Sequence, residues 1–181
     1  MAAMTTTRNK EISFNASMVQ AILDGRKTVT RRPVKVPSDL PPTARLEFRP
    51  KSKLWGWWVN LGSGFDLLHG DAFSCPYGKP GDRLSTHNQL QYPKKTFIIV
   101  SAGLERLQDI SEADALKEGV DPGCGHCGKP ALPDGCGCAN PDPMPRDAFI
   151  ETWNDIYASQ PEKQWNANPW AWRIEFRLEK P

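Results

Sequence analysis

The chain has 181 residues, of which 39% are hydrophobic and 24% are charged, so it can bury a core and is not disordered throughout. Its length fits one domain, or one domain with a sizeable insertion. The net charge of +2 neither indicates nor excludes a polyanionic partner. The charges are uneven: residues 1–60 hold 11 Lys and Arg against 4 Asp and Glu, and residues 61–181 hold 12 against 17. A basic N-terminal third suits contact with phosphate, and it equally suits a solvated surface.

No segment reaches the roughly 20 apolar residues that a membrane-spanning helix needs. The first residues, MAAMTTTRNKE, also lack the apolar stretch of a secretory signal. We therefore expect a cytoplasmic protein with no membrane partner. A reducing compartment argues against reading the five cysteines as disulfides.

The first predicted element is a helix that ends at Gly25. Asn15 or Ser17 can cap its start, because a short oxygen-bearing side chain accepts a hydrogen bond from the free backbone N–H groups there. Met18 and Ile22 lie on one face of such a helix, and a glycine just after it is typical of a left-handed cap.

Strands and turns are predicted along the middle of the chain. Residues 33–53 are rich in proline and lysine and are expected to be irregular, whereas 54–61 (LWGWWVNL) form an aromatic strand. A dense turn signal lies at 76–82, and the continuous apolar run within 96–104 indicates a buried strand.

Two helices and one strand are predicted toward the end of the chain. A short helix runs from Ser111 to Glu118, and a longer one covers 146–158 with aromatic side chains along one stripe. Residues 170–179 alternate between apolar and polar side chains, which is typical of a half-buried strand. Because strands and helices are mixed without a regular βαβ rhythm, the sequence predicts an α+β fold.

Residues 121–145 hold six prolines and five glycines without hydrophobic periodicity, so this segment needs a staple to become ordered. Its four cysteines follow the spacing C-x2-C-x8-C-x-C, which suits a tetrahedral zinc ion bound by four thiolates. These predicted ligands are Cys124, Cys127, Cys136 and Cys138. Four filled positions leave no open site, so the zinc is expected to be structural. The alternatives are His126 in place of one cysteine, a redox pair, or free thiols; Cys75 is expected to be a packed residue.

A basic segment at residues 25–32 (GRKTVTRR) follows the first helix. It places four cations and two hydroxyls within seven residues, and such groups can grip a phosphate or the polar edge of a base. The candidate ligand-binding residues are Lys27, Thr28, Thr30, Arg31 and Arg32. The alternative is an ordinary basic turn whose cations complement the C-terminus of the helix.

Tryptophans and cations are interleaved around residues 49–58. In a strand Trp57 shares a face with Trp55, while Trp58 faces the other way. Aromatic side chains among cations can stack bases, which makes Trp57 a further candidate ligand-binding residue. A tryptophan-rich strand can equally be core. Core is the expectation for the tryptophans on periodic apolar stripes, which are Trp153, Trp170 and Trp172.

The stretch MVQAILDGRKTVTRRP resembles the opening of ASCH-domain proteins, a branch of the PUA-like superfamily with the signature G-x-K-x-x-E-x-R. Gly25, Lys27 and Arg32 match this signature, and Thr30 stands at the Glu position. The likeness continues through CPYGKPGDRL, LERLQDISEADALKEGV and NPWAWRIEFRLE, in the order that ASCH proteins of phages and prophages often show.

The resemblance implies a β-barrel with flanking helices, in which the segment from Lys27 to Arg32 forms a turn at the mouth of a cleft. It implies a flexible N-terminus over residues 1–10 and a single ASCH domain over 11–181, with 121–145 as a zinc-loop insertion. It also implies binding of RNA, a nucleotide or a modified nucleoside, in the cytoplasm of a bacterial host cell.

Some ASCH proteins are amidohydrolases of acylated cytidine, and ribonuclease activity is described for others. The resemblance places Lys27 and Thr30 where the catalytic lysine and threonine would stand. The strand position where relatives often carry glutamate holds Ile98, which cannot move a proton. A hydrolase would therefore need a substitute, and the candidates are Asp82, His87 and Glu105. A third reading is a protein that binds a host factor while the inherited cleft is vestigial.

Overall fold

Two β-sheets organise the computed structural model, which describes residues 10–60, 66–86, 94–120 and 144–179. The larger sheet has the strand order β1-β6-β7-β8-β2, and the smaller has the order β3-β4-β5. The strands of the larger sheet are β1 (Lys10–Ile12), β6 (Arg83–Thr86), β7 (Thr96–Arg106), β8 (Trp170–Leu178) and β2 (Val29–Pro33). Those of the smaller sheet are β3 (Ala44–Arg49), β4 (Leu54–Asn60) and β5 (Asp66–Phe73).

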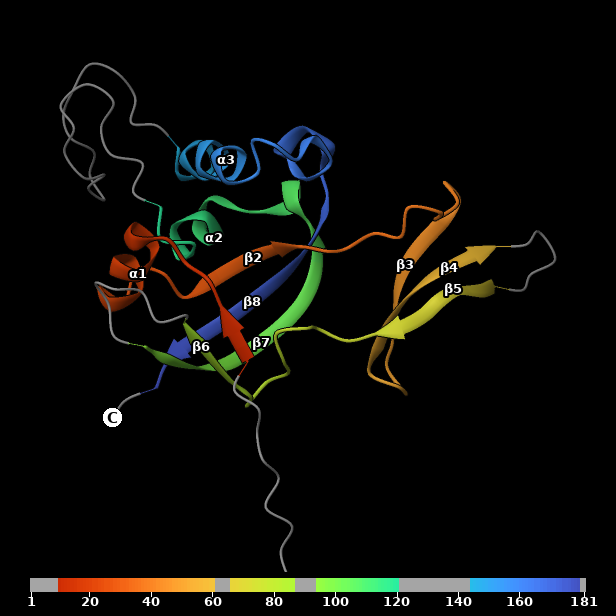
Figure 1. Cartoon of the computed structure of the whole chain (residues 1–181), viewed down its shortest axis with the longest axis horizontal. Coiled ribbons are helices and arrows are strands. Elements are labelled where there is room, and N and C mark those ends of the chain that lie inside the picture. Colours follow the sequence, from red (N-terminus) through yellow and green to blue (C-terminus); the bar gives the residue numbers. More distant parts are fainter. Residues whose placement is uncertain (1–9, 61–65, 87–93, 121–143, 180–181) are drawn as a thin grey trace, which may run out of the picture.

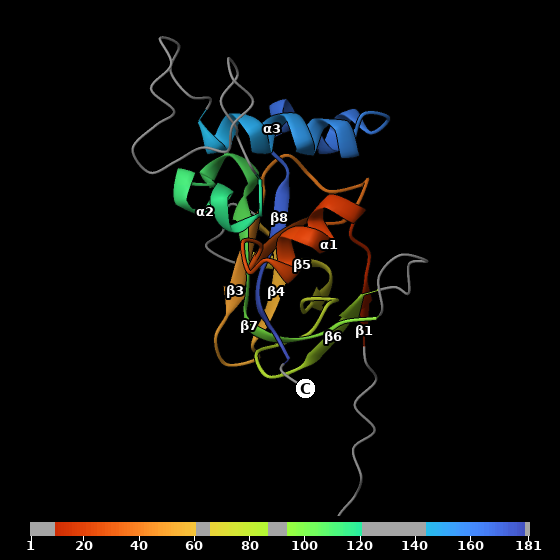
Figure 2. The same cartoon turned by 90° about the vertical axis from the view of Figure 1, so that its left-hand side faces the viewer.

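The described helices gather beside the five-stranded sheet, and the three-stranded sheet lies at the opposite end of the molecule (Figure 1). Figure 2, turned to face the helices, shows α3 lying across the top of α2. The α-helices are α1 (Ala16–Leu23), α2 (Glu112–Lys117) and α3 (Pro145–Ile156), and the short 3-10 helices are η1 (Leu107–Asp109), η2 (Pro161–Lys163) and η3 (Trp165–Ala167). None of the described helices combines the length and apolar composition that crossing a lipid bilayer requires.

The mixed α+β architecture is confirmed, whereas the expected β-barrel is wrong. Closure would require the edge strands β1 and β2 to be joined, directly or through further strands. In the described residues β3, β4 and β5 pair with one another instead, so the larger sheet stays open at both edges.

Capping residues act as the sequence predicts. The Asn15 side chain accepts a hydrogen bond from the Met18 backbone N–H, and the chain leaves α1 through Gly25 with φ +75°. Ser111, where the sequence predicts the start of the short helix, caps α2 in the same way, through a hydrogen bond from the Asp114 backbone N–H. The predicted strands at the positions of β4, β7 and β8 are also present.

The prediction of an irregular segment over 33–53 is wrong in part, because β3 lies within it. The residues of β3 pair in antiparallel register with β4, from Ala44 opposite Val59 to Arg49 opposite Leu54. The local sequence ARLEFR carries little strand signal, so the partner strand decides its structure.

Aromatic side chains connect the two sheets. The Trp172 ring of β8 lies edge-on to Trp55 of β4, with 6.4 Å between centroids, and to Phe73 of β5, with 6.1 Å. A second cluster under α2 and α3 includes Phe149 and Trp153. Trp153 and Trp172 are buried, as the sequence predicts.

Candidate functional site

Lys27 lies in the interior rather than on a solvated turn. Its side chain is fully buried, and Nζ donates hydrogen bonds to Oε2 and to the backbone oxygen of Glu118, each at 2.7 Å. A backbone bridge between the same two residues joins the segment before β2 to the end of α2. Burial lowers the pKa of Lys27, and the Glu118 carboxylate opposes that change.

Arg31 lies next to this pair and is also buried. Its guanidinium reaches Glu105 of β7 with Nη2–Oε1 at 2.6 Å, Asp114 of α2 with Nη2–Oδ2 at 3.1 Å, and Glu118 with Nη1–Oε1 at 3.0 Å. One side chain of β2 therefore ties together a strand and a helix that lie far away in the sequence.

Arg173 of β8 extends the network from the other side of Asp114, with Nε–Oδ2 at 3.0 Å. Hydrogen bonds from Arg173 lower the pKa of Asp114 to about 2. The charge of Arg173 and the contact with Arg31 act in the same direction, whereas partial burial opposes them. Three cations thus meet three carboxylates in a charge-balanced network of Lys27, Arg31, Arg173, Glu105, Asp114 and Glu118.

The other predicted residues of the basic segment differ in their contacts. The Thr30 Oγ1 is buried without a hydrogen-bond partner among the described residues, whereas the Thr28 backbone N–H and C=O bond to Lys117 and Phe176. Arg32 is half-buried; its Nη2 donates to the Ser13 backbone oxygen at 2.7 Å, and its guanidinium lies over a phenylalanine ring.

A cavity of about 20 Å³ adjoins Arg31, Arg32 and Glu118, and α3 covers it with Trp153 and with Tyr157 just beyond the helix. Burial raises the pKa of Tyr157. A cavity of this size holds about one water molecule, whereas ligand pockets are roughly 300–1,000 Å³. The network in this conformation therefore has no room for a nucleoside.

The carboxylate that meets Lys27 is one that sequence reasoning missed. Ile98 lies in β7 opposite Arg83 and Arg177. Of the suggested substitutes, Glu105 binds Arg31, Asp82 accepts a hydrogen bond from a backbone N–H in a turn, and His87 lies outside the described residues. Glu118 lies in the stretch LERLQDISEADALKEGV, but nothing in its local sequence pattern links it to Lys27.

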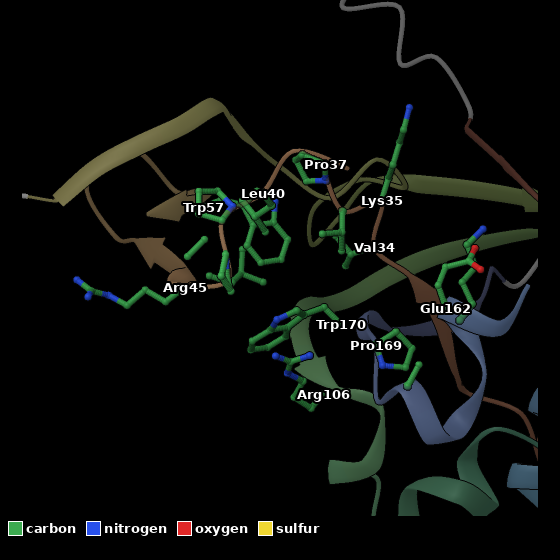
Figure 3. Close-up of a pocket in the computed structure, with 17 residues that line it drawn as sticks. Val34, Lys35, Pro37, Leu40, Arg45, Trp57, Arg106, Glu162, Pro169 and Trp170 are labelled. Atoms are coloured by element: carbon green, nitrogen blue, oxygen red, sulfur yellow. The ribbon is translucent and has the colours of Figure 1, made fainter. Parts of the chain in front are cut away.

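A larger cleft lies between the two sheets (Figure 3). Its volume is about 780 Å³, and none of Lys27, Thr28, Thr30, Arg31 and Arg32 lines it. Trp57, the remaining residue predicted to bind a ligand, does line it. The structure thus separates the basic segment from the tryptophan with which it was grouped.

One wall of the cleft carries a stacked cation and ring. The Arg106 guanidinium carbon lies 4.5 Å from the centroid of the Trp170 ring, and Nη1 donates to the Asn168 backbone oxygen at 3.0 Å. Trp57 and Leu40 lie across from this pair (Figure 3). Trp170 was expected to be core; it packs against the hydrophobic core but is only half-buried, and it also lines the cleft.

The charges along the cleft are predominantly positive. Lys35, Arg106 and Lys163 have no carboxylate partner within the described part of the chain, and Glu162 is the acidic residue of the lining. Arg45 also lines the cleft, but its guanidinium is paired with Glu47 and Asp66. Trp57 is 5% exposed and packs against Phe73, so it forms part of the wall rather than a projecting platform.

The four cysteines predicted to bind zinc lie outside the described residues, as does His126. The rest of the chain, where it is described, contains no cluster of three or more metal-ligating side chains. Structural zinc therefore stays a prediction. Cys75 is buried as expected, and burial raises the pKa of its thiol.

No protein-family model and no curated protein sequence matches the chain. Two solved structures are similar to it in fold. One is a protein of Enterococcus faecalis V583 described by the family model DUF984, with a TM-score of 0.47 and 11% identity over 94% of this chain and 80% of that chain. The other is an ASCH domain from Lactobacillus crispatus JV V101, with a TM-score of 0.46 and 12% identity over 93% and 78%. The phage or prophage type expected from the sequence has no counterpart in these matches.

Proposed function

We propose that this protein is an ASCH-like domain that binds single-stranded RNA or a nucleotide through the cleft between its two sheets. The observation that carries the proposal is the Arg106–Trp170 stack on the wall of a 780 Å³ cleft. A base can stack on such a pair, and the cleft volume lies in the range of ligand pockets. The phage type and a host-protein partner stay predictions from the sequence.

The positions of the cations support this cleft over the basic segment. Lys27 and Arg31 are buried and already neutralised by carboxylates, so a phosphate would have to displace Glu118 to reach them. Lys35, Arg106 and Lys163 instead line an open cleft without such partners among the described residues. They can contact a phosphodiester backbone while a base stacks against Trp170.

A binding titration with a labelled single-stranded RNA octamer and with AMP tests the proposal. Arg106→Ala and Trp170→Leu should each weaken binding about 5- to 160-fold, because a stacked base contributes roughly 1–3 kcal/mol. Arg177→Ala is the matched control, since Arg177 is an exposed cation of β8 outside the cleft lining.

If Arg106→Ala and Trp170→Leu leave binding unchanged while Arg32→Ala abolishes it, the binding site is the basic segment and the proposed cleft site is refuted. Absence of binding by the wild-type protein to both probes would refute the proposed function as a whole.

A hydrolase is the second candidate, and the Lys27–Glu118 pair favours it. A buried lysine with a lowered pKa and a neighbouring carboxylate can together move a proton. The nearby Thr30 hydroxyl has no hydrogen-bond partner among the described residues. The small volume beside the pair means that α3 would have to move to admit a substrate.

Incubation with N4-acetylcytidine and with RNA, followed by product analysis, tests this second candidate. Thr30→Val is the informative variant, because it removes a buried hydroxyl that no described residue pairs with; it changes the shape little and should not unfold the protein. Turnover that is absent, or equal in wild type and Thr30→Val, would reject a catalytic role for this site.

A further inference from the structure

A second cavity, of about 470 Å³, shares no lining residue with the proposed RNA cleft. We propose that it binds a small aromatic carboxylate, held by a wall of aromatic rings and a rim of lysines. This site is independent of the proposed function, and its ligand belongs to another chemical class.

Three rings in sequence form the apolar wall. Phe48 of β3 lies 5.1 Å from Trp55 of β4 between ring centroids, and Trp55 lies 6.4 Å from Trp172 of β8. Phe48 is 43% exposed, which leaves a large aromatic surface facing solvent at the edge of the cavity. A planar hydrocarbon ring would cover this surface and gain ring–ring contacts.

Three lysines from separate parts of the chain line the same cavity. Lys10 belongs to β1, Lys53 to the turn before β4, and Lys79 to the turn before β6. Within the residues that the structure describes, none of the three ammonium groups has a carboxylate partner. Asp82 also lines the cavity, but its Oδ2 accepts a hydrogen bond from the Lys79 backbone N–H at 3.0 Å. Because three ammonium groups outnumber this one carboxylate, the rim is net positive and suits one acidic group.

Lys53 occupies a backbone conformation that favours glycine. Its φ is +57°, and its backbone N–H donates to the Arg49 oxygen at 2.8 Å to close the turn between β3 and β4. A residue with a side chain is strained in this region, and such strain is often found where the side chain has a role. At Lys53 that role is to place an ammonium group at the cavity, where it can bind the carboxylate.

The scarcity of hydrogen-bonding groups separates this ligand from a nucleotide. Besides the lysines, the polar side-chain groups of the lining belong to Ser74, Cys75 and Asp82, together with the indole N–H groups of Trp55 and Trp172. A nucleobase carries several donors and acceptors along its edges, and those that these few groups do not meet would lose water without gaining a partner. An aromatic hydrocarbon with a single carboxylate leaves no such group unpaired.

Isothermal titration with 2-naphthoate tests the proposal, with the uncharged 2-naphthalenemethanol as the matched ligand control. We expect one naphthoate per chain, and binding of the alcohol about tenfold weaker, because the lysines act on the carboxylate. Lys53→Gly should weaken naphthoate binding while keeping or raising the melting temperature, since it relieves backbone strain. Lys51 is an exposed lysine of the same turn that does not line the cavity, so Lys51→Ala should change neither the naphthoate affinity nor the melting temperature.

Three results would overturn the proposal. Equal binding of naphthoate and the alcohol would show a nonspecific apolar patch. Equal affinity of the Lys53→Gly and Lys51→Ala variants would remove the lysine from the site. Displacement of naphthoate by AMP would assign the cavity to nucleotide binding. None of these results depends on whether RNA binds at Arg106 and Trp170, so failure here is distinguishable from failure of the proposed function.

Discussion

Lys27 and Glu118 form a buried ion pair across 91 positions of sequence, with Nζ and Oε2 2.7 Å apart. The pair joins the segment between α1 and β2 to the end of α2. Gly119 makes room for it: its φ is +81°, and a Cβ there would lie 2.7 Å from the Cβ of Lys27. The candidate catalytic lysine is thus also a structural contact, and its replacement acts on stability as well as on chemistry.

Removing one partner of this pair should destabilise the fold strongly. Lys27→Met leaves the Glu118 carboxylate buried with Arg31 as its remaining ionic partner, and we expect a loss of about 3 kcal/mol in the free energy of unfolding. Adding Glu118→Met should cost less than the sum of the two single changes, because the second removes the charge left unpaired.

Urea denaturation of the two single variants and the double variant measures this coupling. Lys117→Met is the control, since its side chain is 49% exposed, and it should shift the free energy of unfolding by less than about 0.5 kcal/mol. A Lys27→Met variant as stable as Lys117→Met would contradict the prediction.

Asp114 should make the stability depend on acid pH. Its pKa is lowered from 3.8 to about 2 in the folded protein, mainly by hydrogen bonds from Arg173. The unfolded chain therefore binds the proton more readily, so this contribution is present above pH 3.8 and is lost as the pH falls from there toward 2. Asp114→Asn should flatten this part of the profile.

Thermal unfolding between pH 2 and pH 6 checks the Asp114 prediction. Asp109→Asn provides a control, because Asp109 is exposed and has no ion pair to lose among the described residues. If Asp114→Asn and wild type lose stability in parallel as the pH falls, Asp114 does not contribute as stated.

Binding of RNA in the cleft should depend on salt to a degree set by the lining cations that have no carboxylate partner among the described residues. Three of them, Lys35, Arg106 and Lys163, predict a slope of about −2 for the logarithm of the association constant against that of the salt concentration. Combined replacement of Lys35 and Lys163 by alanine should reduce the slope to about −0.7, whereas Arg177→Ala should leave it unchanged. A slope near zero in the wild type would show that phosphate contacts do not drive binding.

The cysteine-rich segment should hold about one zinc ion per chain, as expected for a tetrahedral site of four thiolates. Elemental analysis of purified protein should find the metal in wild type and in Cys75→Ser, and should not find it in Cys124→Ser/Cys136→Ser. Metal-free wild-type protein with intact, reduced cysteines would refute the zinc site.

The sequence by itself determined the elements that depend on near neighbours. The caps at Asn15 and Ser111 and the left-handed Gly25 act within four residues of the helix ends, so local chemistry suffices to place them. The alternation of apolar and polar residues in β8 likewise indicates which of its side chains are buried, because successive side chains of a strand point to opposite faces.

Only the tertiary structure decided the partners of those elements. Arg31 meets Glu105 and Asp114 from 74 and 83 positions away, and no local pattern indicates which carboxylate a buried cation will find. The cleft arises in the same way, because Trp57 and Trp170 become its walls only once β3–β5 fold into a separate sheet instead of closing a barrel. Local backbone preferences act over a few residues, whereas burial of charge and the pairing of strands depend on the whole chain. The candidate sites are built from buried charges and paired strands, so only the folded chain could place them.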